Sequence, residues 1–132
     1  MHQDAFQQFR VVGVEDGGFS KKTDSGVSKA LFVSVLFVGT WLYAFQLDKI
    51  TVDGLDATEN LSKMLRSWSF DTVILAGVSF AGFNLVDSLY IFKEYGKPLI
   101  IVARTKPNNV SVRRALQQHF EDWRVRWGVF EK

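Results

Sequence analysis

Carboxylates follow an apolar run near the start of the chain, where residues 10–19 read RVVGVEDGGF. The apolar part predicts a short buried strand, and the glycines after Glu15 and Asp16 predict that the chain turns away at its end. Adjacent strand residues point to opposite faces, so only one of the two acids lines a given site. A carboxylate at such an edge needs solvent, a metal ion or a hydrogen-bond donor to balance its charge. An ordinary acidic turn is the structural alternative.

Two later motifs carry further acids, VDGLDAT at 52–58 and NLVD at 84–87. Phosphodiester cleavage with two Mg²⁺ or Mn²⁺ ions needs several carboxylates to converge, so that the metals lie about 3.5–4 Å apart. Carboxylate oxygens are ligands of the kind that such hard cations take. The catalytic and metal-binding candidates are Asp16, Asp53 and Asp56, and Asp87 is a further candidate metal ligand.

Each acid of the two later motifs also has a structural explanation. Asp53 precedes Gly54, as residues of tight turns do. Asp56 and Glu59 have the spacing of a capping box, and Asp87 can cap the next helix in the same way. The residues alone leave both interpretations open.

Size and composition indicate one folded domain over residues 1–132, with 47% hydrophobic side chains. A formal net charge of +2 permits nucleic-acid binding without arguing for it, because dedicated binders usually show a concentrated basic face. The absence of cysteine excludes thiolate nucleophiles, zinc–cysteine sites and disulfides. It also fits a reducing compartment, and the N-terminal residues show no secretory pattern, so we expect a cytoplasmic protein.

Residues 30–47 contain no charged side chain and approach the length of a membrane span. Gly39 and Thr40 interrupt the segment, which is rich in Val, Phe, Tyr and Trp. This pattern predicts two strands joined by a tight turn, at about Ala30–Val38 and Trp41–Val52. We therefore expect a hairpin and no membrane anchor.

The rest of the chain alternates helices and strands. The expected elements are a helix that starts at Asp56, a buried strand at Val73–Ala76, a loop at Gly77–Phe83, a helix that Asn84 caps and Gly96 ends, a buried strand at Leu99–Ala103 and a helix at about Ser111–Trp127. In the last helix an apolar stripe indicates core contact, and it consists of Val112, Leu116, Phe120, Trp123 and Trp127.

The predicted order is βββαβαβα, an α/β architecture with a mixed five-stranded sheet and flanking helices, as in the ribonuclease H-like fold. Strands one and three of a meander point the same way, and crossover strands are parallel to strand one. Their carboxyl ends share one edge, where open sheets with crossovers bind ligands. We expect Asp16 and Asp53 to meet there, with Asp56 and Asp87 close by.

Other residues near this edge are candidates for contact with nucleic acid. Ser79, Phe80 and Asn84 lie where backbone donors of a helix start can bind phosphate. Phe80 or Phe83 can stack on an unstacked base, although buried packing under the loop explains them equally well. Basic residues follow the last strand and can track a phosphate backbone, with a solvated face as the alternative, and they are Arg104, Lys106, Arg113 and Arg114.

The segments VVGVEDGGF, VDGLDAT, GVSFAGFNLVD and GKPLIIVAR followed by KP resemble the archaeal domain of unknown function 99, or endonuclease dU, family, which is related to endonuclease V. The resemblance covers about Arg10–Leu116. It implies a ribonuclease H-like fold and metal-dependent cleavage of nucleic acid near a deaminated base. Asp16 matches the first-strand aspartate that such nucleases use for metal binding. Related nucleases also carry an acid at the end of the fourth strand, where this chain has Ala76.

The sequence therefore supports two hypotheses. The first is a Mg²⁺- or Mn²⁺-dependent endonuclease that acts on DNA or RNA, with deaminated bases as candidate targets. The second is a non-catalytic ribonuclease H-like module that binds nucleic acid or a protein partner, which Ala76 favours. Exposed apolar stripes also make a homodimer a candidate assembly.

Overall fold

The computed structural model describes residues 8–19, 28–103 and 108–131. Two predicted nucleic-acid contacts, Arg104 and Lys106, lie outside these residues. The elements in chain order are β1 (Arg10–Phe19), β2 (Lys29–Val38), β3 (Trp41–Thr51), α2 (Ala57–Arg66), β4 (Thr72–Leu75), β5 (Ser79–Phe80), β6 (Asn84–Leu85), α3 (Ser88–Tyr95), β7 (Leu99–Ile101), α4 (Asn109–His119) and α5 (Trp123–Phe130).

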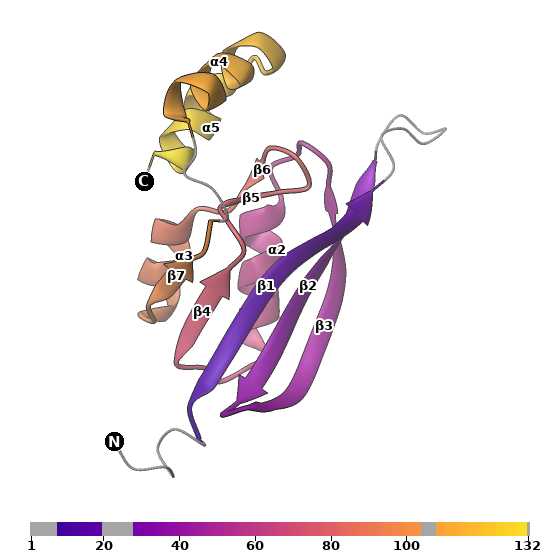
Figure 1. Cartoon of the computed structure of the whole chain (residues 1–132), viewed down its shortest axis with the longest axis vertical. Coiled ribbons are helices and arrows are strands. Elements are labelled where there is room, and N and C mark those ends of the chain that lie inside the picture. The colour runs from indigo at the N-terminus through magenta and orange to yellow at the C-terminus, as the bar shows by residue number, and fades with distance from the viewer. Residues whose placement is uncertain (1–7, 20–27, 104–107, 132) are drawn as a thin grey trace.

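One sheet of five strands, in the order β3-β2-β1-β4-β7, organises the fold (Figure 1). β2 runs antiparallel to β1 and β3, whereas β4 pairs in parallel with β1 and β7. These pairings confirm the predicted α/β architecture with a mixed five-stranded sheet. Since β1, β3 and β4 run in the same direction, their carboxyl ends lie at one edge of the sheet, the edge at which such sheets bind ligands.

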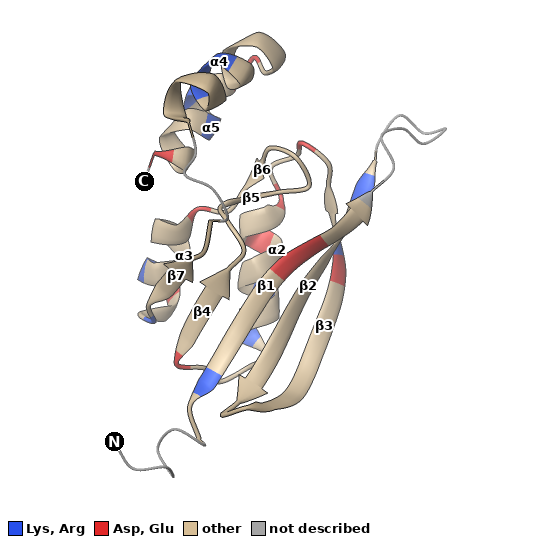
Figure 2. Cartoon of the chain, in the orientation of Figure 1, with Lys and Arg blue, Asp and Glu red and all other residues tan. Residues whose placement is uncertain are grey.

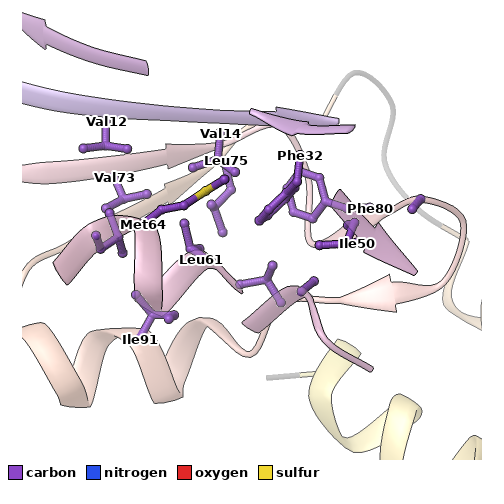
Figure 3. Close-up of a cluster of buried hydrophobic side chains, with 14 of the residues drawn as sticks. Val12, Val14, Phe32, Ile50, Leu61, Met64, Val73, Leu75, Phe80 and Ile91 are labelled. Carbon is purple, nitrogen blue, oxygen red and sulfur yellow. The ribbon is translucent and has the colours of Figure 1, made fainter. Parts of the chain in front are cut away.

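One face of the sheet packs against α2 and α3 and forms the core. Val12, Val14 and Phe32 project from the strands toward Leu61 and Met64 of α2 (Figure 3). Each of these side chains is at most 3% exposed. Burying an apolar side chain of this size stabilises a fold by about 1.5–3 kcal/mol. Alternate residues of β1 and β2 therefore fix which face of the sheet meets the helices.

β2 and β3 form the hairpin that the sequence predicts. Their bounds, Lys29–Val38 and Trp41–Thr51, differ from the expected ones by a single residue at two of the four ends. Gly39 has a φ of 60°, the left-handed conformation that glycine adopts without a steric penalty. Within the described part of the chain, no helix is long and apolar enough to cross a membrane.

The predicted start of α2 at Asp56 is confirmed, and the predicted start of α3 at Asn84 is wrong. Asn84 lies in β6, and the N-cap of α3 is Asp87, whose Oδ1 accepts a hydrogen bond from Tyr90 N at 3.1 Å. The segment 77–83, predicted as a loop, includes β5 of the small β5–β6 hairpin. At α2, Asp56 occupies the N-cap position without a capping hydrogen bond from its side chain. Asn84 and Asp56 each bond to another element instead, which local sequence spacing does not reveal.

The chain after α3 also differs from the prediction. Gly96 ends α3 as expected, with a φ of 67°. The strand expected at Leu99–Ala103 is shorter and not buried, since β7 is an edge strand and Ile101 is 44% exposed. The helix expected at Ser111–Trp127 is two helices, because Phe120 between them is extended, with φ −133° and ψ 128°.

α4 and α5 pack against each other, beyond the carboxyl end of β4 and next to β6 (Figure 1). Leu116 of the predicted stripe is fully buried, and the remaining members are half-buried. The stripe is a packing contact, as predicted, but it joins the two helices and does not cover the sheet.

Candidate active site

Asp16 and Asp53 hold one turn, residues 81–83 between β5 and β6. Asp16 Oδ2 accepts a hydrogen bond from Ala81 N at 2.7 Å, and Asp53 Oδ1 accepts one from Phe83 N at 2.9 Å. Asp53 N also donates to Ala81 O at 2.8 Å. An acid in the second half of β1 and an acid just after β3, where Figure 2 shows red stretches, therefore meet at the same turn.

The backbone is strained on both sides of this contact. Asp53 has a φ of 56° and Ala81 a φ of 46°, and they are the only described residues other than glycine with positive φ. Such conformations are uncommon outside glycine and cluster at functional sites. Gly82, with a φ of 79°, has no room for a Cβ because Asp53 Oδ1 occupies that place. The turn is thus fitted closely around the Asp53 carboxylate.

Asp56 lies in a network of hydrogen bonds that joins β3, α2 and β6. Its carboxylate accepts hydrogen bonds from Asn84 Nδ2 at 2.6 Å, from Thr51 Oγ1 at 3.0 Å and from Thr51 N at 3.1 Å. Asn84 is fully buried, and its Oδ1 accepts from Ala57 N at 3.0 Å while its Nδ2 also donates to Thr51 O. Asn84 therefore caps α2 from a distance and has no side-chain group left to contact nucleic acid.

Burial alone raises the pKa of Asp56, but hydrogen bonds from Asn84 and Thr51 to the carboxylate outweigh it and hold the pKa below the ordinary value of 3.8. Lys29 Nζ lies 4.0 Å from Asp56 Oδ2. Asp56 is accordingly ionised at neutral pH, and its oxygens bind the scaffold.

The other residues predicted to contact nucleic acid near this turn also have structural roles. Phe80 is fully buried and packs edge-on against Phe32, with ring centroids 5.2 Å apart, so it is not placed to stack on a base. The Ser79 hydroxyl donates to Gly82 O of its own turn. Phe83 is half-buried, with its ring against Phe120. Core packing and turn closure account for these residues.

The four predicted carboxylates do not form one metal cluster. Among the residues that the structure describes, no group of three or more His, Asp or Glu side chains is arranged to hold a metal ion. Asp56 bonds to its network, and Asp87 caps α3. The structure brings Asp16 and Asp53 together at one turn and keeps Asp56 and Asp87 in scaffold roles.

Two neighbouring cavities open at the carboxyl edge. One, of about 550 Å³, is lined by both β1 acids, Glu15 and Asp16, and by Ala76 and Val102. The other, of about 520 Å³, lies between Gly77–Ser79 and the end of α5. Both are lined by Gly77 and Ala103, so they adjoin. The contribution of α5 to this cavity was not predicted, because no periodicity in the sequence indicates that this helix packs at the carboxyl edge.

The donor set at the first cavity fits one hydrated divalent cation and does not fit a pair. Mg²⁺ commonly binds through one or two carboxylates, with water and substrate phosphate as the remaining ligands. Asp16 supplies a carboxylate, whereas its strand neighbour Glu15 lines the cavity but points to the other face of β1, and within the described residues Asp16 Oδ1 accepts no hydrogen bond. Ala76 also lines this cavity, and its side chain offers no oxygen ligand there.

A buried arginine connects α5 to this region and was not predicted. Arg126 is 6% exposed and donates to Asp122 at 2.8 Å, to Phe83 O at 2.9 Å and to Gly54 O at 3.2 Å. Its guanidinium also lies over the Phe120 ring, 4.0 Å from the centroid. The bonds to residues beside Asp53 and in the 81–83 turn fix α5 next to the carboxylate edge.

Arg113, a predicted phosphate contact, lies on α4 within reach of two indole rings. Its guanidinium carbon is 5.7 Å from the Trp123 centroid and 5.8 Å from the Trp127 centroid. The guanidinium carbon of Arg124 lies 4.9 Å from the same Trp123 centroid. The two Arg113 contacts favour the packing of α4 on α5, whereas Arg124 and Trp123 both belong to α5.

Comparison with known proteins finds both similar sequences and similar structures. The chain is 37% identical over 124 residues to a UPF0215 protein of Pyrococcus horikoshii, a match that covers 91% of this chain and 63% of the relative. The chain thus spans less than two thirds of the length of that relative. A crystal structure of a protein of unknown function from Archaeoglobus fulgidus aligns at a TM-score of 0.79 and 28% identity, over 92% of this chain and 68% of that one.

Endonuclease V from Bacillus subtilis shares the fold, at a TM-score of 0.54 and 14% identity, over 82% of this chain and 49% of that one. This likeness confirms the predicted ribonuclease H-like architecture of the endonuclease V type. The sequence profile described as endonuclease dU matches residues 7–132. The chain therefore belongs to the endonuclease dU family, as its motifs predict.

Proposed function

We propose that this domain is a metal-dependent endonuclease that hydrolyses phosphodiester bonds in nucleic acid. The observation that carries the proposal is the position of Asp16. It lies beside Glu15 in the second half of β1, on a cavity of about 550 Å³, in a chain of the endonuclease dU family. Asp16 is the proposed ligand of one Mg²⁺ or Mn²⁺ ion, which when bound would supply a Lewis acid and an activated water.

The residues around Asp16 set its position. The Ala81 N–H fixes Asp16 Oδ2, which leaves Oδ1 as the oxygen for the cation. Asp53 holds the other end of the same turn, so it acts as a positioning residue rather than as a ligand. Movement of the 81–83 turn would displace the Asp16 carboxylate. Asp56 and Asp87 keep α2 and α3 in place and take no direct part.

The adjoining cavity of about 520 Å³ suits a nucleobase. Its volume lies within the range of small-molecule sites, about 300–1,000 Å³. A base turned out of a strand into this cavity would bring its phosphate toward Asp16, as enzymes that act on bases require. Deaminated bases, in DNA or RNA, are the proposed targets on the ground of membership in the endonuclease dU family. We assign the activity to the cytoplasm, which the cysteine-free sequence fits.

A second candidate function is binding of nucleic acid without cleavage. Ala76 favours it, because this residue lines the same cavity as Asp16 and offers no oxygen ligand. The lack of any three-acid group within the described ranges favours it as well.

Cleavage assays distinguish the two functions. A labelled single strand with one uracil or hypoxanthine is incubated with the wild-type chain and millimolar Mg²⁺ or Mn²⁺. We expect one cut near the base, lost with chelator and lost in Asp16→Asn. Asp48→Asn, which changes an exposed acid on β3, is the matched control and should cut normally. Binding without any cut, equal in wild type and Asp16→Asn, would support the second function instead.

A further inference from the structure

Arg126 of α5 joins two turns that come from distant parts of the chain. Its Nη1 donates to Phe83 O at 2.9 Å, in the 81–83 turn, and to Gly54 O at 3.2 Å, shortly after β3. Its Nε donates to Asp122 Oδ1 at 2.8 Å, which balances the charge and orients the guanidinium. The planar fork of an arginine holds several acceptors at fixed positions, which a lysine does not. α5 therefore supplies a fixed cross-link between the two turns.

Phe83 is held through its N–H, its carbonyl and its ring. The N–H donates to Asp53 Oδ1 at 2.9 Å, and the carbonyl accepts from Arg126. The ring packs edge-on against Phe120, with centroids 5.7 Å apart. The Arg126 guanidinium lies over the same Phe120 ring, 4.0 Å from its centroid. The end of the 81–83 turn is thus fixed by the α4–α5 pair on one side and by Asp53 on the other.

The 81–83 turn depends on such contacts because its backbone is strained. Ala81 has a φ of 46°, and Asp53, whose N–H donates to Ala81 O, has a φ of 56°. Such conformations persist only where the surrounding structure over-determines them. Ala81 is fully buried, and its N–H is the donor that fixes Asp16 Oδ2 at 2.7 Å. The position of the Asp16 carboxylate therefore depends on contacts made two residues further along the turn.

α5 also lines the cavity next to the one that holds Asp16. Val129, Phe130 and Glu131 face the cavity of about 520 Å³, and they follow Arg126 closely in the chain. The two cavities adjoin at Gly77 and Ala103. One short helix thus contacts both the proposed base cavity and the turn that holds the proposed cation ligand.

We propose that Arg126 is a positioning residue of the cation site, and that it sets the Asp16 carboxylate through the 81–83 turn. This inference rests on the proposed function, which assigns Asp16 as the ligand. Arg126 bonds to neither the cation nor the substrate. It acts by holding Phe83 O and Gly54 O, and so keeps the Ala81 N–H directed at Asp16 Oδ2.

Electrostatics alone predicts the opposite effect of losing Arg126. A positive charge near a cation site repels the ion, so its removal would by itself strengthen binding. Removal also leaves the Asp122 carboxylate without its ion-pair partner, which adds negative charge to the region. Displacement of Asp16, in contrast, weakens cation binding. The direction of the change in affinity therefore distinguishes positioning from electrostatics.

Calorimetric titration of Mn²⁺ into the full 132-residue chain tests the proposal. We expect the dissociation constant to rise at least about fivefold in Arg126→Leu, and less in Arg126→Lys, which keeps the charge and a donor. Arg124→Leu removes an exposed charge from the same helix and should bind Mn²⁺ at least as tightly as wild type. Unchanged or tighter binding in Arg126→Leu would overturn the proposal.

Leu116→Ala controls for a general loosening of the two helices. Leu116 is fully buried on α4, so its truncation weakens the helix packing without removing a bond to the turn. We expect wild-type affinity for Mn²⁺ in this variant. A loss equal to that of Arg126→Leu would overturn the proposal, because helix packing in general would then account for the effect.

Amide exchange at Ala81 tests the same step without a metal. Its N–H donates to Asp16 Oδ2, so its exchange in the metal-free chain reports on that bond. We expect faster exchange in Arg126→Leu than in wild type or Arg124→Leu, and Arg126→Lys takes both tests if circular dichroism shows Arg126→Leu unfolded. A wild-type chain that binds no Mn²⁺ would refute the proposed function, and Ala81 exchange would still decide whether Arg126 holds the turn. Unchanged exchange at Ala81 would overturn the inference.

Discussion

At the residue scale, the acids of the carboxyl edge differ in what their oxygens already bind. Asp56 accepts hydrogen bonds from Asn84 and Thr51, and Asp87 caps α3. Asp53 is held by Phe83 N, and Asp16 has one oxygen on Ala81 N. A carboxylate that the scaffold saturates is a poor ligand, because a cation must replace those bonds. Asp16 and Asp53 each bond through one oxygen, but Asp16 also lines the cavity of about 550 Å³, so it is the strongest ligand candidate of the four.

A third carboxylate at position 76 should strengthen cation binding. Ala76 lies at the cavity that Glu15 and Asp16 line, so Ala76→Asp adds an oxygen ligand there. We expect the dissociation constant for Mn²⁺ to fall by about tenfold or more, which is about 1.4 kcal/mol. Isothermal titration calorimetry measures it, and Ala103→Asp controls for added charge in the same cavity. An equal effect of both substitutions would contradict a ligand site centred on Asp16.

The stability that Asp56 provides should depend on pH. Its pKa is lowered in the folded state, so its contribution is complete above the ordinary value of 3.8 and is lost as pH falls through the folded pKa. Asp56→Ala leaves buried donors without acceptors and should lower the free energy of unfolding by about 1–3 kcal/mol at pH 7. Urea unfolding at pH 7 and pH 3 should show the gap to wild type narrowing in acid. A gap that is constant or wider at pH 3 would refute the network role.

At the element scale, the β5–β6 hairpin is the contact point for the parts of the site. β1 reaches it through Asp16, the turn after β3 through Asp53, and α5 through Arg126. Sequence patterns predicted the long strands and α2, since these are set by local periodicity. They missed β5, β6 and the break at Phe120, because tertiary contacts are made at those positions, hydrogen bonds at the β5–β6 turn and ring contacts at Phe120. Asn84 illustrates this, since a residue typical of a helix start caps a helix 27 positions away in the sequence.

Loss of Arg126 should release α4 and α5 from the site. Arg126→Leu removes the hydrogen bonds to Phe83 O and Gly54 O, each of which with a charged donor contributes about 1.5–3 kcal/mol. Hydrogen exchange should then be faster in residues 109–130 while the β1–β4 core keeps its protection. Arg124→Leu, at an exposed position on the same helix, is the control. Unchanged exchange in 109–130 would show that other contacts hold the helices.

At the scale of the whole molecule, the sequence predicted the fold more completely than it predicted the site. The meander and crossovers place the acidic motifs on one edge, as their order predicts. A shared edge does not determine where the side chains point, however. Asp56 and Asp87 accept hydrogen bonds from neighbouring residues and do not converge on one site. The sheet face opposite α2 and α3 shows a related limit, because the nearly continuous apolar run of β2 indicates cover on both faces without identifying what provides it.

The central claim is that Asp16, and not the acids bound to the scaffold, holds a divalent cation. Titration of Mn²⁺ into the wild-type chain, Asp16→Asn and Asp87→Asn tests it most directly, with unfolding curves to show that each variant is folded. We expect one ion per chain in wild type and Asp87→Asn, and affinity at least about tenfold weaker in Asp16→Asn. Equal affinity in wild type and Asp16→Asn, or loss of binding in Asp87→Asn alone, would contradict the account.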